Sequence, residues 1–289
     1  MSHQAPVLFT EKYEARVEHT FQRKKSKVFA TVRNRTEGVI GAESLTMYVA
    51  GKGRTTKRPS RHADIPPMNA GRSKIKLTTE DDFASDYIDD EDLDKMLADD
   101  RDVVADQGAF AIARALDDYV VEEINGTDQY VGDWSEGMSV DLALQATTNA
   151  ALYEWPDDEG GWYGLLGPNA WNQMLTYKQF ASGEYVGDAL PYLNKAYVRS
   201  WNGVTWMRHT GLVSPDTDQE NGLLYYGPAI AAVGQRSGKP DIWWDGKKQA
   251  WLVTQRLRAG AKRHVEPCAI QLRYNPNAPF YGVNNTPAT

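Results

Sequence analysis

A long basic excursion between two strand-like segments constrains the fold of this chain more than any other feature of its sequence. Residues 45–49 and 74–78 have the alternating or β-branched pattern of strands. The residues from Gly51 to Gly71 between them are polar and basic, with few apolar side chains that a core could bury. A loop of this length is uncommon in a compact domain unless it has a function, so we expect a projecting β-hairpin loop.

The excursion is part of a sharp partition of charge along the chain. Residues 1–76 carry 16 Lys+Arg and 6 Asp+Glu, residues 77–136 carry 3 basic and 20 acidic residues, and residues 137–289 carry 13 of each. A basic block often indicates nucleic-acid binding, but the acidic block that follows would repel phosphate. Two solvated surfaces, or opposite blocks that meet between copies of the chain, are the other interpretations. The charges alone do not choose among these three.

The best helical pattern spans residues 91–124. Apolar side chains recur near helical spacing, carboxylates lie at the start, and Asn125-Gly126 provides a stop. Such a helix would be about 50 Å long. Gly108, near its middle, costs about 1 kcal/mol relative to alanine, so the helix could break there.

The other segments predict a mixed chain of the α+β class. Shorter helices are expected at 9–26, at 140–153 after a Ser139 cap, and at 169–180. Strands are expected at 28–32, 165–166, 204–208, 223–226, 249–258 and 269–274, with a hairpin turn at Asp245-Gly246.

Composition argues against several classes of protein. No apolar run approaches the roughly twenty residues of a membrane span, and Met1–Pro6 lacks the apolar stretch of a signal peptide. The single cysteine, Cys268, allows no internal disulfide, and a small buried thiol is its expected state. We therefore expect a soluble, intracellular protein. Its 41% apolar residues are few for a compact globule, which favours extended parts that neighbours order.

No motif typical of catalysis or of metal binding stands out. The 5 histidines are scattered, without the His-x-x-x-His or Cys-x-x-Cys spacing of zinc sites. Gly51–Arg54 lacks the Gly-Lys-Ser/Thr ending of a phosphate loop, and 216–222 is read as an ordinary turn because Gly227 stands where a calcium loop needs glutamate. We expect no enzyme, no cofactor and no metal. A glycosidase that uses the tryptophans and carboxylates is the weakest alternative, since no spacing predicts a closed pocket.

Two local patterns and the order of the parts resemble one family. Residues 165–175 (LLGPNAWNQML) are similar to the strand–Pro–helix entry of the axial domain in tailed-phage major capsid proteins of the Hong Kong 97 type. Residues 225–233 (YYGPAIAAV) are similar to that family's strand followed by a small-residue helix. The succession of arm, basic excursion, long acidic helix, mixed region and closing strands is also similar, and it covers nearly the whole chain.

The resemblance implies the α+β Hong Kong 97-type capsid fold. It would divide the chain into an N-terminal arm (1–32), an extended β-hairpin loop (33–80), a peripheral domain with a long spine helix (81–135), an axial domain (136–248), and closing strands of the peripheral domain with a C-terminal tail (249–289). Its function would be that of a structural major capsid protein.

The resemblance also implies partners and a location. Copies would assemble in the host cytoplasm into pentamers and hexamers of an icosahedral head, which encloses double-stranded DNA through non-specific contacts. Members of the family often carry a scaffolding segment before the arm, and this chain has no room for one, so a separate scaffolding protein is expected. A portal, and as a further candidate a decoration protein, would complete the virion.

In this family the extended loop lies across a neighbouring subunit, which gives the charge partition a specific interpretation. Basic side chains of the loop would meet carboxylates of the acidic segment on the next copy. The candidates for this assembly interface are Arg54, Lys57, Arg58, Arg61, Asp89, Asp92, Asp99 and Asp102. Two alternatives stay open: a bacterial nanocompartment shell protein of the same fold, and a nucleic-acid-binding protein that uses the basic block.

Overall fold

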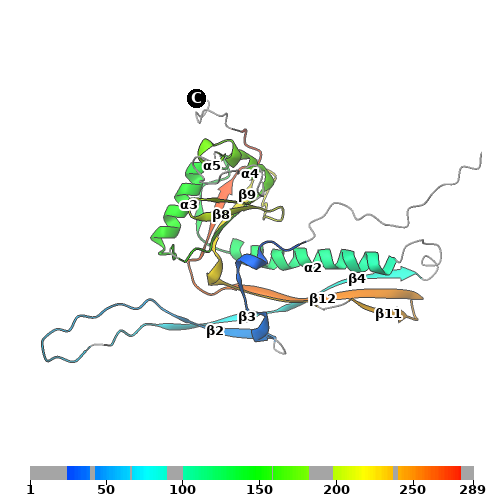
Figure 1. Cartoon of the computed structure of the whole chain (residues 1–289), viewed down its shortest axis with the longest axis horizontal. Coiled ribbons are helices and arrows are strands. Elements are labelled where there is room, and N and C mark those ends of the chain that lie inside the picture. The colour runs from blue at the N-terminus through cyan, green and yellow to red at the C-terminus, as the bar shows by residue number, and fades with distance from the viewer. Residues whose placement is uncertain are drawn as a thin grey trace, which may run out of the picture. The chain divides into compact units, whose positions relative to one another are not determined.

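The computed structural model is a mixed α+β chain in two compact units (Figure 1). It describes residues 25–39, 43–65, 67–89, 100–157, 159–181, 198–236 and 240–280. The smaller unit includes residues 82–114 and 236–257, and the larger includes 26–81, 115–235 and the chain from residue 258. No helix in the described ranges is long and apolar enough to span a membrane.

A six-stranded sheet lies at the centre of the larger unit. Its strands, in spatial order, are β5 (Tyr130–Val131), β13 (Ala269–Tyr274), β9 (Glu220–Tyr226), β6 (Trp162–Leu166), β8 (Val204–Arg208) and β7 (Val198–Trp201). The pairs β5–β13 and β6–β8 are parallel, and the other neighbours are antiparallel. Nearly every residue of β9 is buried, as expected of a central strand. The strands predicted at 165–166, 204–208, 223–226 and 269–274 are confirmed.

Helix α3 (Val140–Leu152) begins where the sequence predicts. The Ser139 hydroxyl oxygen accepts a hydrogen bond from the backbone N–H of Leu142 at 3.2 Å, and Asp141 lies in the first turn. Its buried residues include Val140, Ala143, Ala146, Thr147 and Ala150, which recur near helical spacing. Local signals therefore determine both the start of this helix and the face that it buries.

The helix predicted at 169–180 is two helices, α4 (Pro168–Leu175) and α5 (Lys178–Ala181). Proline occupies the first turn of α4, where its missing N–H costs nothing. Where α4 ends, the Thr176 hydroxyl donates to the carbonyl oxygen of Gln173 at 2.7 Å, which satisfies that carbonyl group. The turn brings the fully buried Phe180 edge-on to Trp171, with ring centroids 5.5 Å apart.

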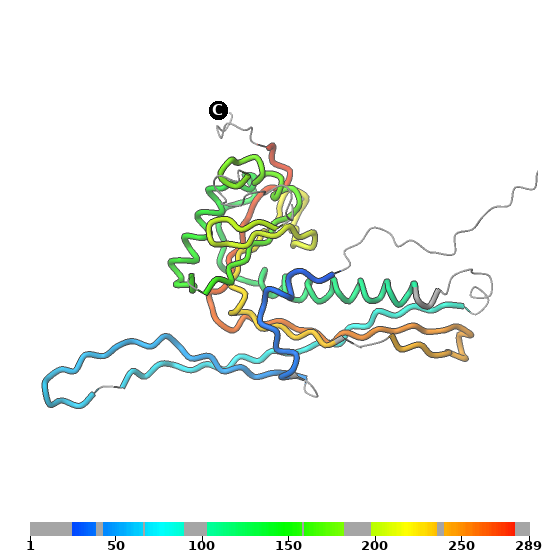
Figure 2. Tube along the Cα trace, viewed as in Figure 1, coloured from blue at the N-terminus to red at the C-terminus, as the bar shows by residue number. Residues whose placement is uncertain are grey.

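The predicted hairpin is present. Strands β2 (Ser44–Ala50) and β3 (Arg72–Thr78) pair antiparallel over their full length, and residues 51–71 join them (Figure 2). The loop is closed next to the strands by a hydrogen bond: the N–H of Gly51 donates to the carbonyl oxygen of Gly71 at 2.6 Å. Leu77 is fully buried, and Leu45 and Met47 pack in the same small apolar cluster.

The strand predicted at 28–32 is wrong, because residues Phe29–Thr31 form a short 3-10 helix, η1. The backbone N–H groups of Lys27, Val28 and Phe29 all donate to the side chain of Asp117, so they are not available to a β-ladder. The hydrogen bonds to Asp117, a residue far along the chain, therefore determine the local structure here, and the β-branched pattern does not.

The small-residue helix expected after residues 225–226 is also wrong. A short 3-10 turn, η3 (Gly227–Ala229), leads into strand β10 (Ile230–Arg236). Its first residues, 230–233, are all at most 1% exposed, and a continuous apolar run of that kind suits a strand that is buried on both faces. β10 pairs in parallel with the two-residue strand β1 (Arg33–Asn34), and helix η2 (Thr36–Val39) follows β1.

The smaller unit contains a second predicted hairpin. Strand β11 (Asp241–Asp245) pairs antiparallel with the first residues of β12 (Ala250–Arg263), which confirms a hairpin here and the strand predicted at 249–258. The turn spans residues 246–249, because Asp245 of the predicted 245–246 turn pairs with Ala250 as the last residue of β11. Strand β4 (Glu80–Asp89) also pairs with β12, and the sequence analysis missed it. Only Ile88 of β4 is buried. Because the strand is mostly exposed and acidic, its sequence shows almost no alternation of apolar and polar residues, which is the usual signal of a strand.

Helix α2 (Asp100–Asn125) ends at Asn125 as predicted and continues through Gly108 without a break. A Cβ atom at Gly108 would make ordinary contacts at 3.5 Å with Gln255 and 3.7 Å with Ala84. An alanine would therefore fit at this position, and the packing does not require glycine. Residues 91–99 of the predicted helix, and nearly all of the helix predicted at 9–26, lie outside the described residues.

Candidate assembly surfaces

The loop between β2 and β3 exposes all of the predicted basic residues. Arg54, Lys57, Arg58 and Arg61 lie at the surface. The Nε atom of Arg58 donates a hydrogen bond to the carbonyl oxygen of Ala63 at 2.6 Å. Within the described ranges, none of the four forms an ion pair with a carboxylate.

Two large apolar residues of the same loop are also exposed. Ile65 is 80% exposed and Met68 is 57% exposed. Exposed apolar side chains that lie close together are typical of surfaces that another molecule covers. The loop thus offers both charge and apolar area to a partner.

The predicted acidic residues are only partly described. Asp89 is the last residue of β4 and its side chain is exposed. Asp102 lies in α2, where the structure describes its backbone but not its side chain. Asp92 and Asp99 lie outside the described residues. The pairing of these carboxylates with the loop of another copy stays a prediction.

The sequence analysis missed the most elaborate polar site of the larger unit, which surrounds Asp117. This carboxylate is fully buried in α2. It accepts hydrogen bonds from the hydroxyl of Ser26 at 2.5 Å and from the backbone N–H groups of Lys27, Val28 and Phe29 at 2.9, 3.0 and 3.2 Å. One side chain thereby holds the whole of residues 26–29 against the helix. We call this arrangement the Asp117 clamp.

A buried imidazole completes the clamp. The Nε2 atom of His209 lies 3.6 Å from Oδ2 of Asp117, and its Nδ1 atom accepts from the N–H of Gly211 at 3.1 Å. Burial alone would raise the pKa of Asp117, but the hydrogen bonds from His209, Ser26 and the backbone outweigh it and hold that pKa at about 2. In the sequence, Asp117 is one more acid in an acidic run, so no local signal identifies it.

A half-buried carboxylate, Glu220, lies beside the motif that carries the family resemblance. Burial raises its pKa, although a hydrogen bond from Tyr274 opposes that effect. The Tyr274 oxygen in turn accepts from the N–H of Gly167 at 3.2 Å. A Cβ atom at Gly167 would lie 1.8 Å from Oε1 of Glu220, so any larger residue would have to displace the Glu220 carboxylate. The glycine of the Gly-Pro entry to α4 therefore leaves room for this half-buried acid.

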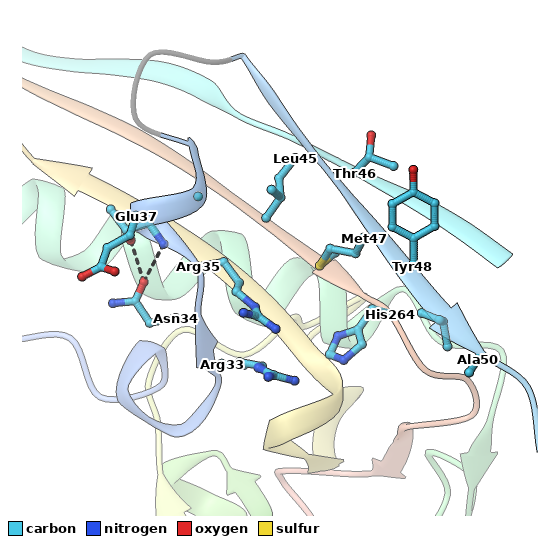
Figure 3. A pocket seen from close by; sticks show the side chains of 13 residues that line it. Arg33, Asn34, Arg35, Glu37, Leu45, Thr46, Met47, Tyr48, Ala50 and His264 are labelled. Carbon is cyan, nitrogen blue, oxygen red and sulfur yellow. Dashed lines mark hydrogen bonds between the residues drawn. The ribbon is translucent and has the colours of Figure 1, made fainter. Parts of the chain in front are cut away.

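An open groove lies elsewhere on the larger unit, with a volume of about 860 Å³ (Figure 3). It is lined by residues 33–38, by consecutive residues of β2 from Leu45 to Ala50, and by His264. Arg33 and Arg35 are its cationic residues. No sequence motif identifies this groove, because its residues come from three separate segments.

Features of catalysis are few. Among the described residues, no group of three or more His, Cys, Asp or Glu side chains could hold a metal ion. Burial and the nearby Glu266 raise the pKa of the Cys268 thiol to about 12, so it is an inert thiol at neutral pH, and its predicted burial is confirmed.

Solved structures define the class of this fold. The chain is similar to one from Mycobacterium phage Che8, with 14% identity, a TM-score of 0.71 and coverage of 96% of this chain and 100% of that one. It is similar to the capsid of cyanophage P-SCSP1u (15% identity, TM-score 0.70, 92% and 93% covered) and to the mature capsid of bacteriophage PhiM1 (12%, 0.69, 97% and 93%). At such identities the likeness establishes the fold, which is the Hong Kong 97-type fold of tailed-phage capsids.

The sequence itself establishes the family. Residues 5–275 match the sequence model of the phage capsid protein family, and the chain belongs to that family. It is thus a major capsid protein, a structural component of a virion. A search among curated proteins found no match.

Proposed function

We propose that this chain is the subunit whose copies form the pentamers and hexamers of an icosahedral phage head around double-stranded DNA. The observation that carries the proposal is the extent of the likeness, which covers 96% of this chain and 100% of the Che8 chain. A match over nearly the whole of both chains supports a common fold for the subunit and not only for its core.

The exposed loop gives a physical reason for assembly. Ordering the backbone of one residue costs about 1–2 kcal/mol, and residues 51–71 bury almost no side chain that could offset this within the chain. Covering Ile65 and Met68 on a neighbour would contribute about 25 cal/mol for each Å² of apolar area removed from water. We therefore assign the loop a partner surface on the next subunit.

We further propose that loop cations select that surface. Arg54, Lys57, Arg58 and Arg61 would meet Asp89, Asp92, Asp99 and Asp102 of the next copy. Exposed pairs contribute about 0–1 kcal/mol each and are screened by salt, so the effect would be collective and would set register more than affinity.

The family resemblance supplies the rest of the proposal. The arm would be 1–32, the extended loop 33–80, the peripheral domain 81–135 with closing strands at 249–289, and the axial domain 136–248. A separate scaffolding protein, a portal and a decoration protein are proposed partners, and assembly is proposed to occur in the host cytoplasm.

The decisive experiment is to express the full chain and observe it by negative-stain microscopy and analytical ultracentrifugation. We expect capsomers or closed shells. A chain that stays monomeric at high concentration would overturn the proposal. Monomers that bind DNA with a steep salt dependence would favour a nucleic-acid-binding protein, and shells that enclose an enzyme without DNA would favour a nanocompartment.

A further inference from the structure

The groove of Figure 3 places two arginines of one segment beside a histidine from a distant part of the chain. Figure 3 shows the guanidinium groups of Arg33 and Arg35 extending toward the imidazole of His264. Arg33 pairs with Ala231 of β10, and the N–H of Arg35 donates to the carbonyl oxygen of Ala232 at 2.8 Å. Because side chains two residues apart in an extended segment point to the same face, the sheet holds both arginines on the groove side.

These charges are not neutralised within the described part of the chain. Neither Arg33 nor Arg35 forms an ion pair there, although Glu37 also lines the groove. Burial and the two arginines lower the pKa of His264, so its imidazole is neutral at pH 7. The buried Nδ1 atom of His264 has no hydrogen-bond partner among the described residues.

The groove also runs along the edge of a strand. Every residue of β2 from Leu45 to Ala50 lines it, whereas a flat face would contribute only alternate residues. Among the described strands, β2 pairs only with β3. A strand edge with free N–H and C=O groups can accept an extended segment, and side-chain sites beside the edge then determine which segment fits.

We propose that this groove, which we call the Arg33/Arg35 groove, binds carboxylates of the acidic segment 89–102 from a second copy of the chain. The inference rests on the proposed assembly and adds a contact that the extended loop does not make. Residues 89–102 contain 8 acids and 2 bases. The four loop cations would pair with four of these carboxylates, so others remain for the groove.

A carboxylate segment fits the groove better than a duplex backbone. Duplex DNA presents a continuous row of phosphates and requires a broad basic surface. The groove offers two guanidinium groups in a recess that also contains the carboxylate of Glu37. Arginine binds carboxylate in a bidentate manner, so two arginines match one or two acidic side chains.

Zero-length cross-linking tests the contact directly. The variant R33K/R35K keeps both charges and introduces amines that carbodiimide joins to a carboxylate in direct contact. Capsomers are assembled from equal amounts of ¹⁵N-labelled and unlabelled variant and analysed by mass spectrometry. We expect new mixed-isotope links between position 33 or 35 and the segment 89–102, which nuclease treatment does not change. The matched control is R208K, an exposed arginine outside the groove, and it should give no such link.

The possible results separate this inference from the proposed function. If the wild-type chain forms no capsomers, the proposed function fails. If capsomers form but the new links are absent, join residues of one copy, or involve other carboxylates, the inference is overturned while the proposed function stands. A link that disappears after nuclease treatment would also overturn it in favour of nucleic acid.

A charge reversal supplies a second measurement. We expect R33E/R35E to stay folded, with an unchanged circular dichroism spectrum, and to lower the assembled fraction about tenfold or more, because a repulsive contact replaces an attractive one. R208E should assemble normally. Normal assembly of R33E/R35E would contradict the inference.

Discussion

The Asp117 clamp and the basic loop use charge in opposite ways. Asp117 is fully buried, and its hydrogen-bond donors all lie in the same chain. Arg54, Lys57 and Arg61 are exposed and have no ion pair among the described residues. A charge that is buried and satisfied within one chain stabilises the fold. A charge that is exposed and unpaired does little for the fold and is available to a partner.

The substitution Asp117→Ala should have the largest effect on stability. It leaves the N–H groups of Lys27, Val28 and Phe29 without their acceptor; that of Val28 is buried and the other two are partly buried. A buried group without a partner costs about 1–3 kcal/mol. We expect a loss of ~3–5 kcal/mol in the free energy of unfolding by urea, together with faster proteolysis near residues 25–29. Glu122→Gln is the control, since Glu122 is exposed on the same helix. Equal effects of the two substitutions would contradict the clamp.

The substitution Gly167→Ala tests the half-buried carboxylate of Glu220. The new Cβ atom would lie 1.8 Å from Oε1 of Glu220, so the carboxylate must move to make room for it. We expect a loss of ~2 kcal/mol, within the range for overpacking. The double variant G167A/E220A removes the clash and should recover part of that loss. No recovery in thermal unfolding would mean that another contact requires the glycine.

Acid should weaken the clamp through Asp117. Its pKa is about 2 in the fold, below the usual 3.8. A lowered carboxylate pKa contributes stability that is present above the unfolded pKa and is lost as the pH falls through the folded value. We expect a loss of roughly 2 kcal/mol between about pH 5 and pH 2, measured by urea unfolding. In Asp117→Asn this component should be absent, and an identical pH profile would show that other groups cause the acid sensitivity.

The smallest effect on stability is expected from the loop. Reversing Arg54, Lys57, Arg58 and Arg61 to glutamate should change the unfolding free energy of the monomer by less than about 0.5 kcal/mol, because the side chains are exposed. The same variant should close fewer shells, and added salt should reduce the difference from wild type. Normal shells from this variant would reject the proposed charge pairing. A large loss of monomer stability would show that the loop cations stabilise the fold as the Asp117 clamp does, which would contradict the difference described above.

The sequence by itself determined the elements whose signals are local. The alternation in β2 and β3, the Ser139 cap of α3, the Asn125 end of α2 and the hairpin between β11 and β12 each depend on a few neighbouring residues, and each was predicted. The order of these elements was enough to indicate the capsid fold.

Only the tertiary structure decided what depends on distant partners. Residues 28–32 have the pattern of a strand, but Asp117, about 90 residues along the chain, takes their N–H groups and produces a 3-10 helix. Residues 230–233 are apolar throughout, so burial on both faces rather than periodicity makes them a strand. The Arg33/Arg35 groove likewise exists only because β10 aligns two arginines beside His264. Local periodicity cannot carry such information, because one window of sequence contains only one side of the contact.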